Sequence, residues 1–127
     1  MQLGFVSAIL PDRSLSEVLA TAARIGYACV EVMCWPPSKA DRRYAGVTHL
    51  DATLPEARLA EEVAAATAST GIQISGLGYY PNCLAADRDE AARSVEHLQR
   101  LIRLAPKLGL NRVNTFIGRD HTRSIDD

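Results

Sequence analysis

One junction, which occurs three times, restricts the fold of this chain more than any other feature. At each occurrence a helical pattern ends at a glycine and a short apolar stretch follows, with the glycines at Gly26, Gly71 and Gly109. Glycine is common just past the end of a helix because it adopts a left-handed backbone conformation at little steric cost. The recurrence therefore predicts a chain assembled from successive helix–strand units.

The residues before each glycine predict three helices with recognisable starts. Ser14 and Asp87 each precede a glutamate by three positions, which is the capping-box pattern. The second helix is expected to begin near Thr53, with Pro55 inside its first turn. Pro106 is expected to kink or shorten the end of the third helix. The apolar positions that fall on one face of each helix are Leu15, Val18, Leu19, Ala22 and Ile25; Leu59, Val63 and Ala66; and Val95, Leu98, Leu101, Ile102, Ala105 and Leu108.

Four short apolar stretches alternate with these helices, and they predict β-strands. They are residues 2–10, 27–35, 72–80 and 110–118. The resulting order is strand, helix, strand, helix, strand, helix, strand. Such an alternation predicts a parallel sheet with right-handed crossover connections.

Two architectures share this alternation: an open doubly wound sheet and a (β/α)₈ barrel. A nucleotide-binding open sheet would carry a glycine-rich turn after its first strand, but "ILPDRS" contains no such motif. The polar loops after the strands, especially residues 35–53, favour a barrel. A whole barrel takes about 250 residues, so we expect an α/β fold with about four parallel strands and three helices. Residues 1–127 would then form the N-terminal half of one barrel domain.

Composition excludes several kinds of partner. The formal net charge is −1, which predicts neither nucleic-acid nor membrane-surface binding. The sequence has no apolar run long enough to span a bilayer and no signal-peptide pattern at its start. Three cysteines without a CxxC pair argue against a disulfide framework. We therefore expect a cytoplasmic protein.

Three segments, "IGYACVEVMCW", "GIQISGLGYYPN" and "LGLNRVNTFIGRDHTRSIDD", resemble the xylose isomerase-like TIM barrel family of sugar-phosphate isomerases and epimerases. The resemblance implies a divalent-metal enzyme, using Mn, Mg, Co or Zn, that acts on a sugar or sugar phosphate. Its chemistry would be aldose–ketose interconversion or epimerisation through an enediolate. The resemblance also implies that the metal ligands come from strands five to eight, so no metal ligand is expected in this chain.

A further capping pattern, from Ser124 to Asp127, predicts the start of a helix that the sequence does not contain. We therefore expect a fragment that is inactive alone. It would form a homo-oligomer or associate with a missing C-terminal half, because an open sheet edge recruits other strands.

Candidate site residues lie in the predicted strands or in the loops that follow them. Glu31 would face the barrel interior as a catalytic or hydrogen-bonding carboxylate, or alternatively form a structural ion pair with an arginine. Trp35 would offer a flat apolar face to a sugar or close the core. His49, without a neighbouring histidine, reads more readily as a surface residue than as a metal ligand.

The third and fourth strands supply the other candidates. Alternation predicts that only one of Tyr79 and Tyr80 points inward. Tyr80 or Asn82 would bind substrate hydroxyls. Asn114 would bind a sugar oxygen from inside the barrel. Just beyond it, Arg119 would bind a phosphate or carboxylate. His121 would act as acid or base, with Asp120 beside it to orient the ring.

Two other functions remain open from the sequence. One is a metal-dependent hydrolase resembling the abasic-site endonuclease branch, which the near-zero net charge and the few histidines disfavour. The other is a non-catalytic half-barrel that binds a sugar or a partner chain.

Overall fold

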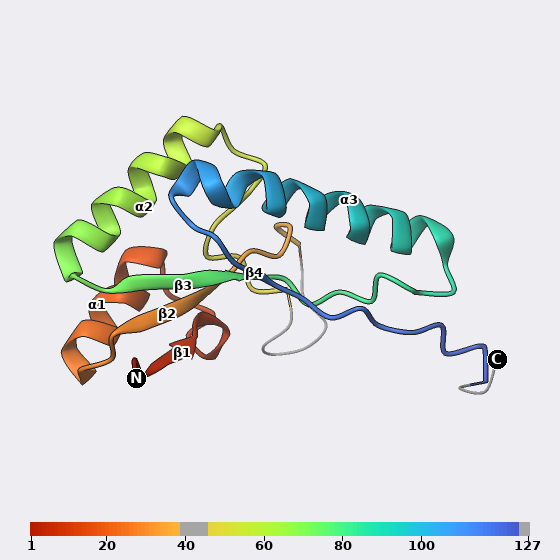
Figure 1. The fold of residues 1–127 in the computed structure, drawn as a ribbon, viewed down its shortest axis with the longest axis horizontal. Coiled ribbons are helices and arrows are strands. Elements are labelled where there is room, and N and C mark those ends of the chain that lie inside the picture. Colours follow the sequence, from red (N-terminus) through yellow and green to blue (C-terminus); the bar gives the residue numbers. More distant parts are fainter. Residues whose placement is uncertain (39–45, 125–127) are drawn as a thin grey trace.

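The structure is a computed structural model that describes residues 1–38 and 46–124. Strands and helices alternate along the chain as predicted (Figure 1). The elements are β1 (Gly4–Val6), η1 (Ser7–Ile9), α1 (Leu15–Ile25), β2 (Cys29–Met33), α2 (Glu56–Thr70), β3 (Gln73–Gly78), α3 (Arg88–Leu104), η2 (Ala105–Leu108) and β4 (Val113–Asn114), where η marks a short 3-10 helix.

The four strands form one parallel sheet in the order β1-β2-β3-β4. Each strand therefore lies beside the strand that precedes it in sequence. A doubly wound sheet reverses its strand order at an internal switch point, whereas a barrel keeps consecutive strands adjacent. The sheet does not close, so the fold is a partial (β/α)₈ barrel, as the sequence predicts.

The helix ends follow the predicted signals closely. Ser14 and Glu17 form a reciprocal capping box at the start of α1, and the Asp87 side chain caps α3. Gly26, Gly71 and Gly109 have φ angles of 94°, 71° and 72°, all in the left-handed region. An alanine at these positions would be strained, which explains why glycine ends each helical segment.

Two predicted boundaries were wrong, and both for local reasons. The strands are shorter than the apolar stretches, because those stretches also supply the turns at each end. Helix α2 begins at Glu56, with Pro55 just before the first turn and not inside it. Thr53 does not cap the helix, because its N–H and hydroxyl both donate to the Asp51 carboxylate within a preceding turn.

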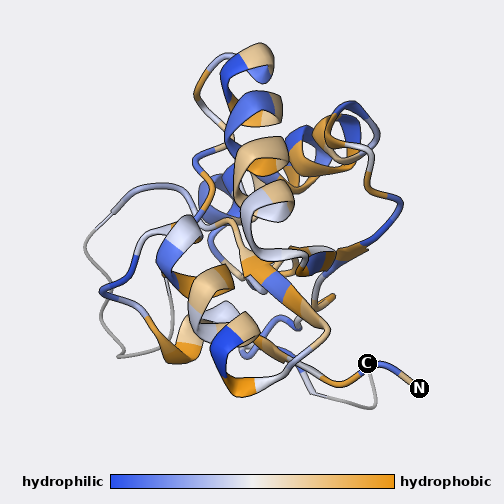
Figure 2. Ribbon diagram, turned by 90° about the vertical axis from the view of Figure 1, so that its left-hand side faces the viewer, coloured by the Kyte–Doolittle hydropathy of each residue, from blue (hydrophilic) through white to orange (hydrophobic). Residues whose placement is uncertain are grey.

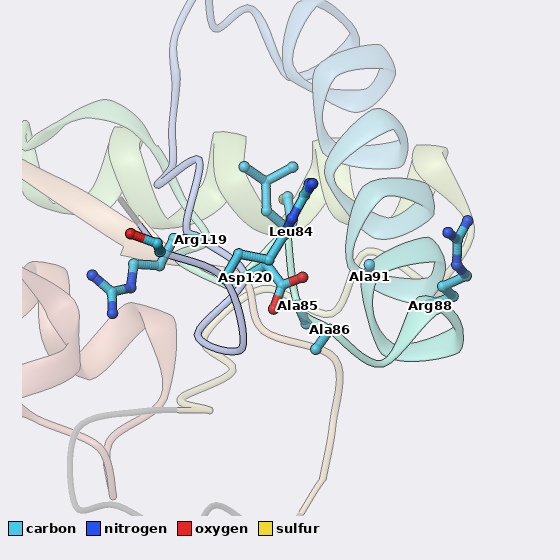
Figure 3. Close-up of a pocket in the computed structure, with 10 residues that line it drawn as sticks. Leu84, Ala85, Ala86, Arg88, Ala91, Arg119 and Asp120 are labelled. Carbon is cyan, nitrogen blue, oxygen red and sulfur yellow. The ribbon is translucent and has the colours of Figure 1, made fainter. Parts of the chain in front are cut away.

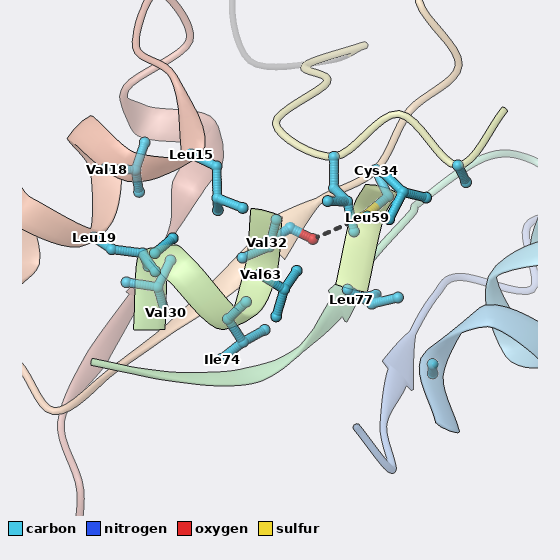
Figure 4. Packing of buried hydrophobic residues seen from close by; sticks show 14 of the residues in the cluster. Leu15, Val18, Leu19, Val30, Val32, Cys34, Leu59, Val63, Ile74 and Leu77 are labelled. Carbon is cyan, nitrogen blue, oxygen red and sulfur yellow. Dashed lines mark hydrogen bonds between the residues drawn. The ribbon is translucent and has the colours of Figure 1, made fainter. Parts of the chain in front are cut away.

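All three α-helices pack on the same face of the sheet (Figure 4). Leu15 and Leu19 from α1, Leu59 from α2 and Leu101 from α3 are almost completely buried in one cluster. The strands contribute their helix-facing side chains to this cluster, which are Val30, Val32, Ile74 and Leu77. Covering one face only leaves the opposite, concave face of the sheet without a helical layer.

The predicted apolar face of α3 was partly wrong. Val95 and Ile102 are 37% and 54% exposed, whereas Ser94 and His97 are buried. His97 Nε2 donates to the Cys34 carbonyl at 2.7 Å, and its ring packs against Tyr79. Polar residues that bond to the segments just after β2 and β3 thus occupy positions that apolar periodicity assigns to solvent.

The helices carry hydrophilic and hydrophobic residues on different sides, as expected when one side packs on a sheet (Figure 2). Within the two described ranges, no helix has the length and apolarity needed to cross a membrane.

Candidate functional site

Three polar side chains meet on the concave face, one from β2, one from the residues just after β3 and one from β4. Val30 and Val32 point toward the helices, so Glu31 between them points the other way. Its Oε1 accepts a hydrogen bond from the Tyr80 hydroxyl, just after β3. Its Oε2 accepts one from Asn114 Nδ2 on β4, at 2.7 Å. We call Glu31, Tyr80 and Asn114 the carboxylate cluster.

Gly78 makes the space for this cluster. A Cβ atom at this position would lie 2.5 Å from Glu31 Oε1 and 2.9 Å from Met33 Sδ. Both distances are shorter than real Cβ contacts, so any side chain here would displace the carboxylate or the methionine. The glycine is needed for close packing and not for an unusual backbone angle.

The carboxylate cluster contains no cation. Within the part of the chain that the structure describes, the salt bridges do not include Glu31. The alternative of a structural ion pair with an arginine is therefore not what these residues form. Burial raises the pKa of the Tyr80 hydroxyl, and the hydrogen bond with Glu31 raises it further. Tyr80 consequently remains a protonated donor at neutral pH.

Aromatic rings flank the cluster on the concave side. Tyr80 lies 4.7 Å from Phe116, measured between ring centroids, and Phe116 is 62% exposed. Trp35 is half-buried and packs edge-on against Tyr79, with 4.9 Å between the ring centroids. It therefore contributes to the helix-facing core and also to the packing on the concave face. The sequence reasoning did not select Phe116. Its alternation with Asn114 was the signal that could have found it.

Asn82 is committed to the backbone of two loops. Its Oδ1 accepts the N–H groups of Arg119 and Leu84, and its Nδ2 donates to the Arg119 carbonyl at 2.8 Å. The amide thus ties the loop after β3 to the segment after β4. Its role as a substrate-binding residue stays a prediction. The observed hydrogen bonds hold the two loops together.

The segment after β4 forms an exposed rim, here defined as residues 118–124. Arg119 Nε donates to His121 Nδ1 at 3.1 Å. A neutral imidazole that accepts at Nδ1 carries its proton on Nε2. Asp120 does not bond to His121, because its Oδ1 accepts from the Thr122 N–H and hydroxyl. These bonds hold the pKa of Asp120 below its usual value.

The expectation that His49 lies on the surface was wrong. His49 is 5% exposed, and its Nε2 donates to the Leu10 carbonyl at 3.0 Å. Its Nδ1 therefore accepts from the Ser7 hydroxyl, at 2.9 Å, while Ser7 Oγ accepts the Met33 N–H. Burial lowers the pKa of His49. The ring joins the ends of β1 and β2 to the loop that follows β2. The other part of that loop, residues 39–45, lies outside the described residues.

The described residues do not assemble a metal site. Across residues 1–38 and 46–124, no three His, Cys, Asp or Glu side chains lie close enough together to hold an ion. Both oxygens of Glu31 also already accept hydrogen bonds from neutral donors.

Polar and aromatic groups at the carboxyl ends of parallel strands, on a face opposite the helices, are the arrangement found in (β/α)₈ barrel proteins. The chain is thus part of a barrel of this class. The sequence matches the xylose isomerase-like TIM barrel family model over residues 19–127, and the chain belongs to that family. This superfamily includes sugar isomerases and epimerases.

Solved structures share the fold at low sequence identity. A probable 3-DHS dehydratase, AsbF, from Bacillus anthracis aligns over 91% of this chain with a TM-score of 0.60 and 16% identity. A xylose isomerase-like TIM barrel/4-hydroxyphenylpyruvate dioxygenase fusion protein aligns over 91% with a TM-score of 0.55 and 18% identity. A protein from Sinorhizobium meliloti 1021 aligns over 90%, with a TM-score of 0.55 and 14% identity.

This chain covers only 38% of the dehydratase, 16% of the fusion protein and 35% of the third structure. No curated protein matches it in sequence.

Proposed function

We propose that this chain supplies part of the active site of an isomerase or epimerase that acts on a sugar or sugar phosphate. The observation that carries the proposal is the carboxylate cluster on the concave face, with Glu31 in the middle of β2, Tyr80 just after β3 and Asn114 at the end of β4. Family membership supports the reaction class, since the superfamily includes enzymes of this kind. The proposed activity belongs to a complete barrel, of which this chain is one part.

In this proposal Glu31 binds substrate hydroxyl groups. Tyr80 and Asn114 each occupy one lone pair of the carboxylate, and a carboxylate offers about four acceptor sites. The remaining sites can accept from a sugar hydroxyl that enters from the open side. Because its two donors come from different strands, the carboxylate is fixed before the ligand arrives. Phe116 and Tyr80 offer apolar ring faces to the C–H groups of the sugar.

His121 would act mainly as a donor in this arrangement. The hydrogen bond from Arg119 leaves its proton on Nε2, so that nitrogen can donate to a substrate oxygen. To serve as a base through Nε2, the ring would first have to give up its bond with Arg119. The proposed catalytic role of His121 is therefore the polarisation of a carbonyl or hydroxyl oxygen.

A divalent metal would belong to the remainder of the barrel. The donor set of the described residues does not fit one, and no step of the proposed chemistry is assigned to a metal held by this chain. We also propose that the chain associates with the strands that complete the barrel, in the same or another polypeptide. Exposed apolar side chains at both edges of the sheet support this association, namely Leu3, Val6, Ile9 and Ile117.

The proposal is tested by assaying the complete barrel for exchange of the proton next to the carbonyl of aldoses, ketoses and their phosphates. Glu31→Gln should lower kcat/KM about tenfold or more, because hydrogen bonds from substrate hydroxyls to a charged carboxylate are stronger than those to a neutral amide. Glu61→Gln removes the same charge from the exposed side of α2 and should leave the rate unchanged. Equal rates for both variants, or metal-dependent nicking of abasic DNA in place of exchange, would contradict the proposal.

A second candidate is a dehydratase, since a probable 3-DHS dehydratase shares the fold. The exposed Phe116 ring beside Tyr80 favours it, because a planar ring face suits a flat, unsaturated ligand. Both reactions can begin with removal of a proton beside a carbonyl. Mass spectrometry of the product separates them, since a dehydratase product has lost one water and an isomerase product has the mass of its substrate.

A further inference from the structure

A hollow lies outside the carboxylate cluster, between the loop after β3, the first turns of α3 and the rim (Figure 3). Its volume is about 820 Å³. It is lined by Cys83, Leu84, Ala85, Ala86, Arg88, Ala91, Arg119, Asp120, Arg123 and Ser124. Two of its three walls directly follow β3 and β4, so it lies at the edge of the sheet where barrel proteins bind ligands.

The charge of this hollow is strongly positive for a chain whose net charge is −1. Arg88, Arg119 and Arg123 line it, and Asp120 is the one carboxylate among its described lining residues. Among the residues that the structure describes, none of these arginines is in a salt bridge, whereas Arg13, Arg100 and Lys107 are. Figure 3 shows Arg119 and Arg88 on opposite sides of the hollow, with Leu84, Ala85 and Asp120 between them.

Hydrogen bonds from the Asn82 side chain hold the wall that carries Arg119 in place. Asn82 accepts the Arg119 N–H at 2.9 Å and donates to its carbonyl at 2.8 Å. Gly118 precedes it with a φ of 81°, and a Cβ there would collide with the Asn82 amide. Asp120 is turned toward Thr122 through Oδ1, and within residues 1–38 and 46–124 it forms no salt bridge with the three arginines, although the charge of Arg123 contributes to its lowered pKa.

We propose that this hollow binds the phosphoryl group of a ligand. A phosphate ester carries a charge near −2 and three acceptor oxygens, and guanidinium groups match these oxygens with paired, charge-assisted hydrogen bonds. Three arginines that form no salt bridge with another described residue line this hollow and can supply that recognition, whereas a neutral sugar would need none of them. The inference deepens the proposed function and rests on it in one respect, since it assigns the phosphate to the substrate and the sugar ring to the carboxylate cluster.

Binding is measured directly on the 127-residue chain by NMR titration with inorganic phosphate, at low and at raised salt. We expect saturable shifts confined to residues 82–91 and 118–124. The double variant Arg119→Gln, Arg123→Gln should weaken binding about tenfold or more, because hydrogen bonds to charged groups are the strong ones. The matched control, Arg24→Gln with Arg103→Gln, removes the same charge from exposed positions outside the hollow and should leave the affinity within about twofold.

Titration with a sugar phosphate, with the same sugar lacking phosphate, and with citrate separates the sources of the anion. Tighter binding of the sugar phosphate than of inorganic phosphate supports a substrate phosphate, and equal binding supports a site for free phosphate. Absence of saturable shifts, preference for citrate over phosphate, or equal losses in the double variant and its control would each overturn the phosphoryl site. If the chain binds phosphate but the complete barrel has no isomerase activity, the proposed function is wrong and the phosphoryl site is still supported.

Discussion

The carboxylate cluster and the rim both follow the strands of one sheet, but they are built in opposite ways. Glu31 is held by residues 49 and 83 positions away in sequence, from two other segments of the sheet. Within the rim, the bonds of Arg119, Asp120 and Thr122 reach only two positions along the chain. Asn82 supplies the long-range contact that anchors the rim, across 37 positions.

This difference predicts how each region responds to change. Long-range bonds between strands form only when the sheet forms, so a perturbation of the carboxylate cluster should affect the stability of the whole fold. Short-range bonds in an exposed segment form and break locally, so the rim should change its own order and little else. Substitutions in the carboxylate cluster should therefore lower stability more than substitutions in the rim.

The largest effect is expected from Gly78→Ala. The new Cβ would lie 2.5 Å from Glu31 Oε1, so the carboxylate has to move away from Tyr80 and Asn114. Overpacking of this kind typically costs about 1–3 kcal/mol. The free energy of unfolding, measured by chemical denaturation, should fall by that amount.

Two controls isolate the cause of the Gly78 effect. Gly76→Ala adds the same methyl group on the same strand, but its nearest contact is 3.2 Å, from the Arg112 carbonyl, so the loss should be smaller. In a Glu31→Ala background the penalty of Gly78→Ala should shrink, because the displaced carboxylate is gone. Full additivity of the two changes would show that Glu31 is not what the methyl group displaces.

The next effect concerns His49, whose buried ring closes the same end of the sheet. Its pKa in the folded protein lies below its ordinary value of 6.5, because burial disfavours the charged ring. Below pH 6.5 the unfolded chain therefore binds more protons, so this contribution to stability is present above pH 6.5 and is lost as the pH falls. The slope should approach about 1.4 kcal/mol per pH unit at most.

His49→Gln and His121→Ala test that assignment as a pair. Removing the buried ring should flatten the dependence of the unfolding free energy between pH 6.5 and 5, at the cost of lower stability near pH 7. Removing the exposed ring of His121 should leave the dependence as it is in the parent protein. If His49→Gln retains the parent slope, another group carries the acid sensitivity.

The regular parts of the fold were accessible from the sequence because their causes are local. Caps at Ser14 and Asp87 and the helix-ending glycines depend on residues within one or two turns, and the structure confirms them. Strand alternation likewise predicted that Tyr79 and Tyr80 point to opposite faces, and in the structure Tyr79 lies in the core while Tyr80 bonds to Glu31.

Other features depended on contacts that no local pattern encodes. His49 is isolated in sequence, and its burial follows from bonds to Ser7 and Leu10, about forty residues earlier. Asn82 resembled a sugar-binding residue because its type and position suit that role, but its partners lie in the segment after β4. A polar side chain can serve a ligand or the backbone equally well, and only the fold decides which one lies within reach.

A smaller loss of stability is expected from Asn82→Ala. This change removes the side-chain hydrogen bonds between the loop after β3 and the rim, and it leaves the carboxylate cluster unchanged. The loss of its three hydrogen bonds, at a half-buried residue, should cost about 1 kcal/mol. Amide exchange at Arg119 should accelerate, while exchange along β2 and β3 stays slow. Faster exchange at Glu31 as well would mean that the two regions form one cooperative unit.

The smallest effect is expected from Thr122→Val, which keeps the shape of the side chain and removes its hydroxyl from Asp120. That hydroxyl is the main cause of the low pKa of Asp120, and the Thr122 N–H is the second. The pKa of Asp120, followed by NMR titration, should therefore rise part of the way toward its ordinary value of 3.8, because the N–H remains. Asp120 is partly exposed and its bond with Thr122 spans only two positions, so the midpoint of unfolding should not change measurably. A shifted midpoint would show that the rim is coupled to the sheet, and an unmoved pKa would show that the turn at Asp120 is held by other bonds.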